Sequence, residues 1–321
     1  MEYGSKPFVR CIVKTLRPSV TVIIPTYNCS LYIEKCINSV LNQTLTNIEI
    51  IVIDDCSSDS TVDLIAPNCE IKILKNKKRL GSGLSRNLGI KYSNGEYIAF
   101  LDGDDFYPEK DSLKKLYNIA KQKNANIVGG SLFIVDAKSN VEIRDFPGQY
   151  FTRSGFINYS DYQHDGGFYR FIFKKDFLIL KNIAFRDLLR MQDPVFLVES
   201  MVASKSFYAI PDYVYAYRKN HKTVDWNEQN VKDKLTAICL ILKISRENKL
   251  AHLHYLMVKN FYNFFRIHLK KVGNFKNQTQ EFLKVLKMID FDLLHSKWEQ
   301  DKFEYSRSRF ILSFFRSFIF N

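Results

Sequence analysis

The stretch that decides the fold is Tyr97-Ile-Ala-Phe-Leu-Asp-Gly-Asp-Asp105, in which an apolar segment runs directly into three carboxylates. Only Gly103 separates Asp102 from Asp104 and Asp105. Two unit charges about 4 Å apart repel by roughly 4 kcal/mol at an effective dielectric of 20, so carboxylates at the mouth of a buried strand call for a cation. Oxygen ligands at this spacing suit Mg²⁺ or Mn²⁺, which keep positions open for substrate phosphates. The stretch therefore predicts a metal–diphosphate site, with a solvated turn as the alternative.

Strands and helices alternate around this stretch. The segments expected to form strands are Val20–Ile24, Ile48–Ile53, Ile71–Leu74 and Tyr97–Leu101, and the expected helices are Ile33–Leu41, Leu84–Tyr92 and Glu109–Gln122. Ser30 is placed to cap the first of these helices. Such alternation predicts an α/β fold, with a doubly wound, mostly parallel sheet and helices on both of its faces.

The loops after three of these strands carry polar side chains. Pro25-Thr-Tyr-Asn28 follows the first strand, Asp54-Asp-Cys-Ser-Ser-Asp59 the second, and the acidic stretch the fourth. In sheets of this kind, ligands bind beyond the carboxyl ends of the strands. Because Tyr27 is available to pack on a base, the three loops together predict a nucleotide pocket, with three unrelated turns as the alternative.

Composition sets the wider frame. The chain has 321 residues, 46% of them hydrophobic, which is enough for one domain of about 200 to 250 residues and an appendage. The formal net charge of +13 predicts attraction to anions, namely nucleotide diphosphates, phospholipid surfaces or nucleic acid.

Cysteine usage and the first residues bear on location. The six cysteines contain no Cys-x-x-Cys pair and no zinc-site spacing, which favours reduced thiols in a cytosolic protein. The start of the chain lacks the apolar segment of a signal peptide, and no apolar run approaches the roughly 20 residues that cross a bilayer. We therefore expect a cytoplasmic protein.

A set of motifs occurs in one order along the first third of the chain. They are Val22-Ile-Ile-Pro-Thr-Tyr-Asn28, Ser39-Val-Leu-Asn-Gln43, Ile51-Val-Ile-Asp-Asp55, Arg86-Asn-Leu-Gly89 and Gly95-Glu-Tyr-Ile-Ala-Phe-Leu-Asp-Gly-Asp-Asp105. Together they resemble glycosyltransferase family 2, whose members are inverting enzymes with the GT-A fold. The resemblance is close over residues 19–108, weaker to about 222 and absent beyond.

The resemblance implies a division of the chain. Residues 1–18 would be an N-terminal extension, 19–108 the nucleotide-sugar-binding half of a GT-A domain and 109–222 its acceptor-binding half. Residues 223–321 would form an α-helical extension that is rich in basic and aromatic side chains.

The same resemblance assigns roles to residues of the first half. Those expected around the nucleotide are Pro25, Thr26, Tyr27, Asp54, Asp55, Arg86 and Asp102. Within this set Asp54 would hydrogen-bond the base and Arg86 would approach the phosphates. Asp102 and Asp104 would contact the ribose and the metal. Cys56 departs from the pattern because Gly is usual there, and Gly accepts positive φ more readily.

The catalytic base is expected in Met191-Gln-Asp-Pro-Val-Phe196. The family places this base as the Asp of a Glu-Asp pair that opens a helix, so Asp193 matches and Gln192 replaces the usual Glu. Asp before Pro is also a good helix start, so Asp193 may be read as a cap as well as a base. Asp187 is the fallback candidate for the base.

A later segment, Tyr213-Val-Tyr-Ala-Tyr-Arg-Lys-Asn-His221, resembles the family strand that precedes a His near the diphosphate. His221 would complete the metal shell or touch a phosphate, and Arg218 or Lys222 would offset the leaving charge. A solvated His is the alternative. Aromatic residues between Phe146 and Tyr169 offer a sugar platform or, alternatively, core packing.

The last segment, Lys302–Asn321, has an apolar side and a basic side at helical spacing. Its apolar residues are Phe310, Ile311, Phe314, Phe315, Phe318 and Ile319. The pattern predicts a helix that lies on an anionic membrane surface. The alternatives are docking on the catalytic domain or on a second subunit of a homo-oligomer.

Taken together, the sequence predicts a metal-dependent, inverting glycosyltransferase on the inner face of the plasma membrane. It would use Mn²⁺ or Mg²⁺ to move a sugar from a nucleotide-diphosphate donor, UDP-linked, to a glycan or lipid-linked oligosaccharide in surface polysaccharide or lipooligosaccharide synthesis. The alternatives are a nucleotidyltransferase and an inactive family member that acts as a binding module. A nucleic-acid-binding module is the last-ranked alternative, and no nucleic-acid partner is expected, because the loop edge is acidic and the cations concentrate on late helices.

Overall fold

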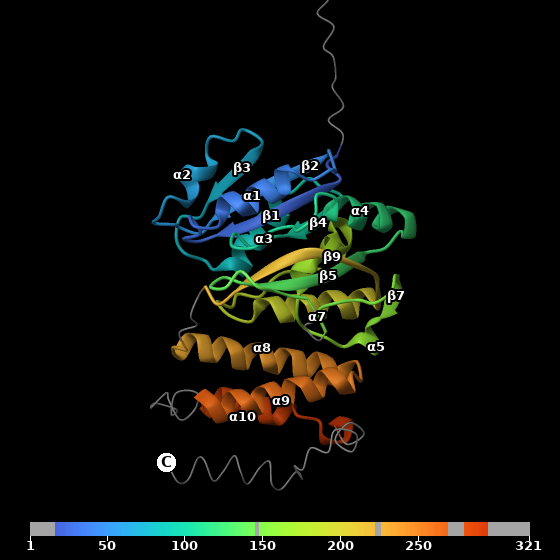
Figure 1. Ribbon diagram of the computed structural model, residues 1–321. Coiled ribbons are helices and arrows are strands. Elements are labelled where there is room, and N and C mark those ends of the chain that lie inside the picture. The colour runs from blue at the N-terminus through green and yellow to red at the C-terminus, as the bar shows by residue number, and fades with distance from the viewer. Residues whose placement is uncertain (1–16, 145–147, 222–225, 269–278, 295–321) are drawn as a thin grey trace, which may run out of the picture.

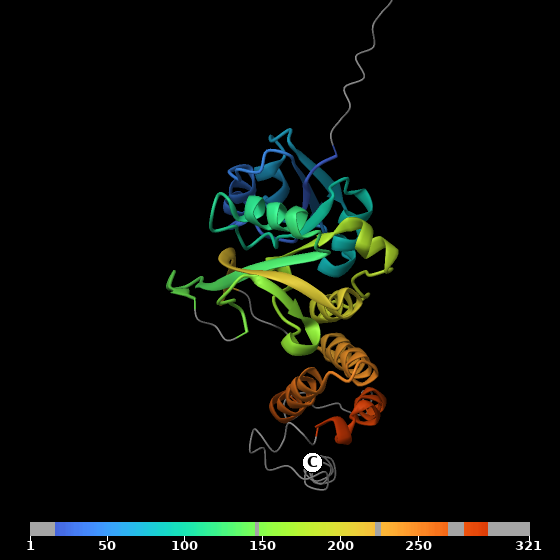
Figure 2. The same cartoon turned by 90° about the vertical axis from the view of Figure 1, so that its right-hand side faces the viewer.

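The protein is described here from a computed structural model that covers residues 17–144, 148–221, 226–268 and 279–294. An α/β region with one continuous sheet lies at one end, and three helices of the C-terminal part lie at the other (Figure 1). Seen after a quarter turn, the helices still form a separate layer below the sheet (Figure 2).

The first part of the chain alternates as the sequence predicts. Its elements are β1 (Val20–Thr26), α1 (Ile33–Leu41), β2 (Ile48–Asp54), α2 (Thr61–Ile65), β3 (Ile71–Lys75), α3 (Ser82–Tyr92), β4 (Tyr97–Phe100) and α4 (Ser112–Lys123). The expectation that Ser30 caps α1 is wrong. Tyr32 is the N-cap, and the backbone N–H of Ser30 instead donates to the carboxylate of Asp59 (3.1 Å).

The second part adds strands that the sequence pattern did not resolve. Its elements are β5 (Ile127–Asp136), β6 (Glu142–Ile143), β7 (Gly155–Asn158), α5 (Tyr159–Tyr162), the 3₁₀ turn η1 (Phe168–Arg170), β8 (Phe171–Lys174), α6 (Lys175–Leu180), α7 (Gln192–Ser204) and β9 (Ser206–Lys219). All described strands join one sheet in the order β3-β2-β1-β4-β8-β5-β9-β7, with β6 paired to β5.

The sheet is mixed. Strands β3, β2, β1 and β4 run parallel, as expected for a doubly wound fold. Beyond β4 the pairing changes, because β8 is antiparallel to both β4 and β5, while β5 and β9 are parallel. The expected α/β architecture is therefore confirmed, and the expectation of a mostly parallel sheet holds only for its first half.

Both faces of the sheet are covered. Alternate residues of β1 point to opposite sides, so Val22 and Ile24 join the core under α1 and α4, whereas Ile23 joins the core under α3 and α7. Helix α3 approaches β1 closely at Gly89, where a Cβ atom would lie 2.4 Å from Ile23 Cγ2. This contact sets how far the side chains of α3 reach over the carboxyl ends of the strands.

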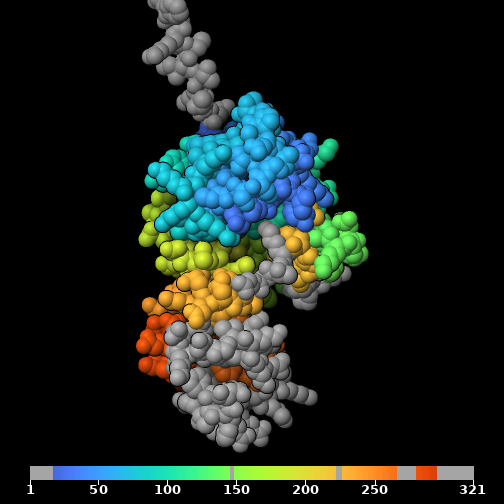
Figure 3. All heavy atoms as spheres, turned by 90° about the vertical axis from the view of Figure 1, so that its left-hand side faces the viewer, coloured from blue at the N-terminus to red at the C-terminus, as the bar shows by residue number. Residues whose placement is uncertain are grey.

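The C-terminal helices extend the core below α7. They are α8 (Glu228–Glu247), α9 (Ala251–His268) and α10 (Thr279–Met288), and their apolar residues form one cluster with those of α7. The space-filling view shows α8 as a layer directly below the α/β region (Figure 3). Among the described residues, no helix is both long and apolar enough to span a bilayer. The predicted amphipathic segment 302–321 lies outside the described residues.

Candidate active site

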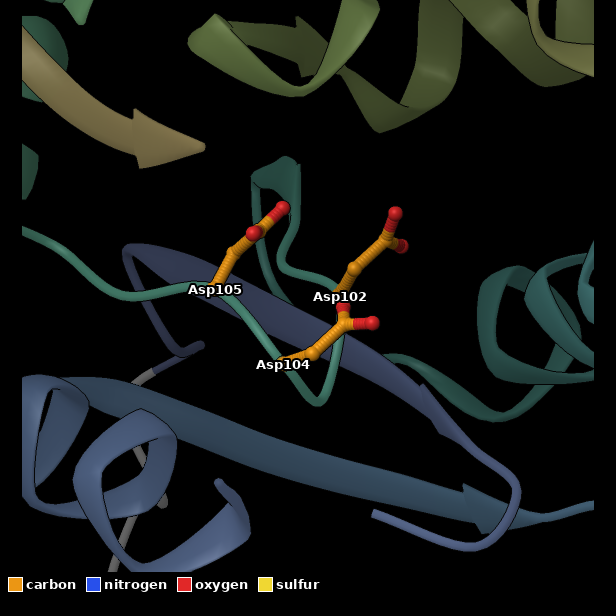
Figure 4. Close-up of side chains that lie close together, drawn as sticks. All are labelled: Asp102, Asp104 and Asp105. Carbon is orange, nitrogen blue, oxygen red and sulfur yellow. The ribbon is translucent and has the colours of Figure 1, made fainter. Parts of the chain in front are cut away.

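An acidic turn follows β4. The carboxylates of Asp102, Asp104 and Asp105 each offer an oxygen within 4.8 Å of the others. They stand on one short turn in which the N–H of Asp105 donates to the carbonyl of Asp102 (2.9 Å) (Figure 4). Gly103 lets the turn pack tightly, because a Cβ there would lie 3.1 Å from Thr26 Cγ2 and 3.2 Å from Cys29 Sγ.

Asp105 anchors this turn. Its carboxylate is buried and accepts hydrogen bonds from the Tyr215 hydroxyl (2.7 Å) and from the backbone N–H of Arg218 (2.6 Å). Burial, with Asp104 and Asp102 adding to it, raises the pKa of Asp105 well above its usual value. Asp105 is thus engaged with β9, whereas the carboxylates of Asp102 and Asp104 contact Arg86 and His221.

Asp104 meets a histidine from the end of β9. The Nε2 atom of His221 lies 2.7 Å from Asp104 Oδ2, and the Nδ1 atom of this ring is buried without a hydrogen-bond partner. Arg218 also braces the turn, since its Nε donates to the carbonyl of Asp104 (2.8 Å) and its guanidinium lies over the Tyr32 ring (4.7 Å). The structure therefore brings His221 to the acidic turn, 117 positions away in the chain.

The donor set fits Mn²⁺ or Mg²⁺. The three carboxylates lie within one ion's reach of one another, and the imidazole of His221 lies beside this group, with Nε2 2.7 Å from Asp104 Oδ2. Hard divalent cations prefer such oxygen ligands and leave positions for phosphate oxygens. Asp102, Asp104 and His221 are the residues that would hold the ion.

Arg86 connects this turn to α7. Its Nη2 donates to Asp102 Oδ1 (2.6 Å) and its Nη1 to Asp193 Oδ1 (2.7 Å), while the side chain is only 2% exposed. The guanidinium also lies 4.8 Å from the centre of the Phe168 ring. Burial opposes the charge of Arg86, but Asp102 and Asp193 outweigh it and raise its pKa.

Asp193 is the second residue of α7 and does not cap it. The N-cap is Met191, and no side chain forms a capping hydrogen bond there. Burial raises the pKa of Asp193, with Asp102 adding to the rise and Arg86 opposing it. Oδ1 is bonded to Arg86, whereas Oδ2 forms no hydrogen bond with the described residues. Asp193 therefore has one carboxylate oxygen that is not bonded to a described residue.

The other two residues predicted near the base lie differently. Asp187 is exposed on the loop before α7 and shares none of the hydrogen bonds that join the described site residues. Gln192 donates from Nε2 to Ser82 Oγ (2.7 Å), and a Cβ at Gly83 would lie 2.9 Å from its Cγ. Gln192 thus fastens α7 to the start of α3 where the family usually has a carboxylate.

Among Pro25, Thr26 and Tyr27, which were predicted to line the base, only Tyr27 is partly exposed to solvent. Pro25 and Thr26 are buried, and the Thr26 hydroxyl donates to the carbonyl of Ile53 (3.4 Å). The guanidinium of Arg79 lies 3.8 Å from the centre of the half-buried Tyr27 ring. Arg79 therefore covers one face of the Tyr27 ring.

The paired acids after β2 have separate partners. Asp54 Oδ1 accepts the N–H of Ser57 (3.2 Å). Asp55 holds the loop before α3, because its carboxylate accepts the N–H groups of Leu80 (2.7 Å) and Gly81 (2.8 Å). Asp55 therefore acts on the orientation of α3, from which Arg86 projects.

Cys56 adopts the conformation for which Gly is usual. Its φ is 65°, in the left-handed region, and its thiol donates to the carbonyl of Asn76 (3.2 Å). The turn keeps its geometry, and the side chain imposes a strain of about 1–2 kcal/mol. The turn therefore accommodates Cys56 in the left-handed conformation that the family pattern assigns to Gly.

The aromatic residues between Phe146 and Tyr169 divide between core and site. Phe151 and Phe168 are buried in the core, and the Tyr162 hydroxyl is bonded to Arg170, so these rings form no sugar platform. Phe146 and Lys222 lie outside the described residues. Sequence reasoning missed the roles of Tyr215 and Arg79. The two-residue period of Tyr213, Tyr215 and Tyr217 in β9 was the signal that these rings share a face.

Comparison with known proteins adds a family to this geometry. The family model described as glycosyl transferase family 2 matches residues 21–178. The chain carries a family 2 glycosyltransferase domain. The match runs through β1, the acidic turn and β8, and ends before α7. The domain therefore includes Arg86 and the acidic turn, while Asp193 and His221 come from the chain that follows.

Several relatives carry similar sequences. The poly(ribitol-phosphate) β-N-acetylglucosaminyltransferase TarP of Staphylococcus aureus is 33% identical over 207 residues, which cover 61% of each chain. The glycosyltransferase GlyG of Streptococcus pneumoniae is 27% identical over 54% of this chain and 50% of its own. The chain thus spans about half to three fifths of the length of these curated relatives.

Solved structures share the fold. TarS residues 1–349 of S. aureus, in complex with UDP-GlcNAc, superimpose with a TM-score of 0.67 at 19% identity, covering 86% of this chain and 82% of that one. A mannosyltransferase of Pyrobaculum calidifontis, in complex with GDP-Man and Mn²⁺, gives 0.52 at 18% identity, covering 73% and 65%. These likenesses confirm the expected GT-A architecture.

Proposed function

We propose that the protein is a metal-dependent, inverting glycosyltransferase that transfers a sugar from a nucleotide-diphosphate donor to a hydroxyl of a glycan. One observation carries this proposal: Arg86 bonds Asp102 of the acidic turn and Asp193 of α7 at the same time. In this proposal Asp102 helps to bind the donor diphosphate and Asp193 accepts a proton, and the guanidinium of Arg86 lies between them. Inverting transfer requires these two groups on either side of the anomeric carbon.

Each residue has a task in this reaction. Tyr27 and Asp54 bind and orient the base of the donor, and Asp102, Asp104 and His221 hold the divalent ion, which supplies charge neutralisation to the leaving diphosphate. Asp193 Oδ2 takes the proton of the acceptor hydroxyl. At the same time the oxygen of that hydroxyl bonds to the anomeric carbon, and the bond from this carbon to the diphosphate breaks. Arg86 keeps Asp193 in place and stabilises its negative charge.

The donor and acceptor follow from the same comparison. TarS was solved with UDP-GlcNAc, which supports a UDP-linked sugar here. Relatives whose names refer to succinoglycan and teichuronic acid biosynthesis support a polysaccharide or lipid-linked oligosaccharide as acceptor. The protein would work at the inner face of the plasma membrane, with residues 302–321 on anionic lipid or on a second subunit.

The experiment that tests the function is product analysis with Mn²⁺ and a panel of UDP- and GDP-sugars. Release of free nucleoside diphosphate, abolished by Asp104→Ala, is the expected result. Release of pyrophosphate would instead identify a nucleotidyltransferase. Donor binding by calorimetry without any turnover, unchanged in Asp193→Asn, would identify a binding module.

The membrane proposal has its own test. Removal of residues 302–321 should shift the protein from vesicle-bound to soluble in flotation with anionic phosphatidylglycerol vesicles, because each basic side chain near such a surface contributes about 1 kcal/mol. Equal vesicle binding by the truncated chain would contradict it. A change in oligomeric state on truncation, measured by light scattering, would assign the segment to a subunit contact.

A further inference from the structure

Two tyrosines from segments that the sequence singled out, but to which it gave no individual role, lie beside the acidic turn. Tyr169 of η1 and Tyr217 of β9 have nearly parallel rings, at 4° and 5.4 Å between centroids. Tyr169 also stacks on Tyr215, at 24° and 4.5 Å. Three rings from two distant elements therefore form one aromatic stack next to the site.

The hydroxyls of this stack differ in their partners. Tyr215 is committed twice, since its hydroxyl donates to Asp105 (2.7 Å) and accepts the N–H of Asp102 (3.2 Å). The hydroxyls of Tyr169 and Tyr217 form no hydrogen bond with any described residue, although both side chains are partly buried. Neither hydroxyl is among the buried side-chain atoms that lack a partner, so both reach solvent and are open to a bound ligand.

Both rings lie near the acidic turn and Asp193. Burial raises the pKa of both Tyr169 and Tyr217, and Asp105, Asp102 and Asp193 raise it further in each case. The aromatic stack therefore borders the carboxylates that, in the proposed reaction, surround the transferred sugar.

We propose that Tyr169 and Tyr217 form a wall for the transferred sugar ring of the nucleotide donor and select it through hydrogen bonds to its hydroxyls. This inference rests on the proposed function. A phenol hydroxyl both donates and accepts, so two of them on parallel rings can read the positions of neighbouring sugar hydroxyls. A site built to bond a hydroxyl discriminates strongly against a sugar that lacks it there.

The test compares variants that lose only one oxygen. Tyr169→Phe, Tyr217→Phe and the double variant keep the stack, and Tyr208→Phe at the other end of β9 is the matched control. With Mn²⁺ present, we expect unchanged affinity for UDP in calorimetry. We expect the affinity for the preferred UDP-sugar to fall about 5- to 10-fold for each hydroxyl removed. The preference between UDP-glucose and UDP-galactose, which differ only at C4, should narrow.

The outcomes separate this inference from the proposed function. If the wild type binds and hydrolyses UDP-sugars but the three variants match it in affinity and preference, the wall is wrong and the function stands. If the variants lose UDP and UDP-sugar affinity equally, the tyrosines support the acidic turn and do not select the sugar, which also overturns the inference. If the wild type binds no nucleotide sugar, both fall together.

Discussion

Two regions of this molecule bury polar side chains in networks of opposite character. At the carboxyl edge of the sheet, Arg86 is buried between two carboxylates, and its Nε has no partner. In the helical region, His254 is fully buried, with Nδ1 at 2.8 Å from Ser245 Oγ and Nε2 accepting the N–H of Asp290 (2.9 Å). The first network is charged and incomplete, and the second is neutral and complete.

The difference teaches how to tell a site from a support. A buried network with every atom satisfied stabilises one conformation and gains nothing from a ligand. A network that keeps charge and leaves atoms unpaired is costly on its own, and a bound ion or substrate offsets that cost. His221, whose Nδ1 is buried and unpartnered, belongs to the incomplete network at the carboxyl edge of the sheet.

The strongest test of this comparison is Asp193→Asn. If Asp193 is the base, turnover should fall by about 10²- to 10⁴-fold, because proton transfer by a positioned side chain contributes that much. The fold should persist, since the amide still accepts from Arg86. Turnover is measured as nucleotide release with saturating donor and acceptor, and Asp187→Asn is the matched control. Unchanged turnover in Asp193→Asn would remove it as the base.

The same residue sets a pH dependence. The pKa of Asp193 is raised, so the acid limb of kcat/KM should lie above the ordinary Asp value of about 3.9. Activity is present where the carboxylate is ionised and is lost as the pH falls through the raised value. A pH profile whose acid limb is identical in Asp193→Glu and the wild type would contradict this assignment.

Arg86→Met should have the next largest effect, on stability. Removing one partner of a buried ion network typically costs about 3–5 kcal/mol, because the remaining charges are left uncompensated. We expect that loss in the free energy of unfolding from urea denaturation at pH 7. Lowering the pH should restore part of it by protonating Asp193, whose pKa is raised. Arg86→Lys is the control, because it keeps the charge and one hydrogen bond. If Arg86→Met lost no more free energy of unfolding than Arg86→Lys, the bridging role of Arg86 would be contradicted.

In the helical region, we expect a smaller effect on stability, caused by a buried side chain that is neutral. Burial lowers the pKa of His254 to about 4 from an unfolded value near 6.5. The unfolded chain therefore binds more protons between these values, and stability should fall as the pH drops from about 6.5 to 4, by up to about 1.4 kcal/mol per pH unit. His254→Gln should flatten that slope in denaturation measured across this range. An unchanged slope would show that other groups cause it.

Cys56→Gly should have the smallest effect, a gain. Relief of the left-handed φ favours the folded state by about 1–2 kcal/mol, and the greater freedom of Gly in the unfolded chain offsets about 0.5–1 kcal/mol of it. We expect the free energy of unfolding to rise by about 0.5–1 kcal/mol. Cys56→Ala keeps the strain and loses the thiol, so the difference between the two variants isolates the backbone contribution. No difference would mean that the turn relaxes.

Much of the first half was predictable from the chain because its signals are local. The β-branched runs at Val20–Ile24 and Ile48–Ile53, and the helical period after Ile33, specify strand and helix through contacts within a few residues. The second half was less predictable, because β8 and β9 join the sheet in an order set by long-range pairing. Ser30 was misread as a cap because Asp59, from the next loop, takes its N–H.

The candidate site follows the same division. The sequence by itself determined which side chains end the strands, because the acidic turn, Tyr27 and Asp54 each follow an apolar run directly. Only the tertiary structure decided that Arg86 joins residues 16 and 107 positions away, that His221 meets Asp104, and that Tyr169 lies parallel to Tyr217. The physical reason is that a strand end is a local property of the chain. Which distant side chains share it depends on how α3, α7 and β9 pack around one sheet.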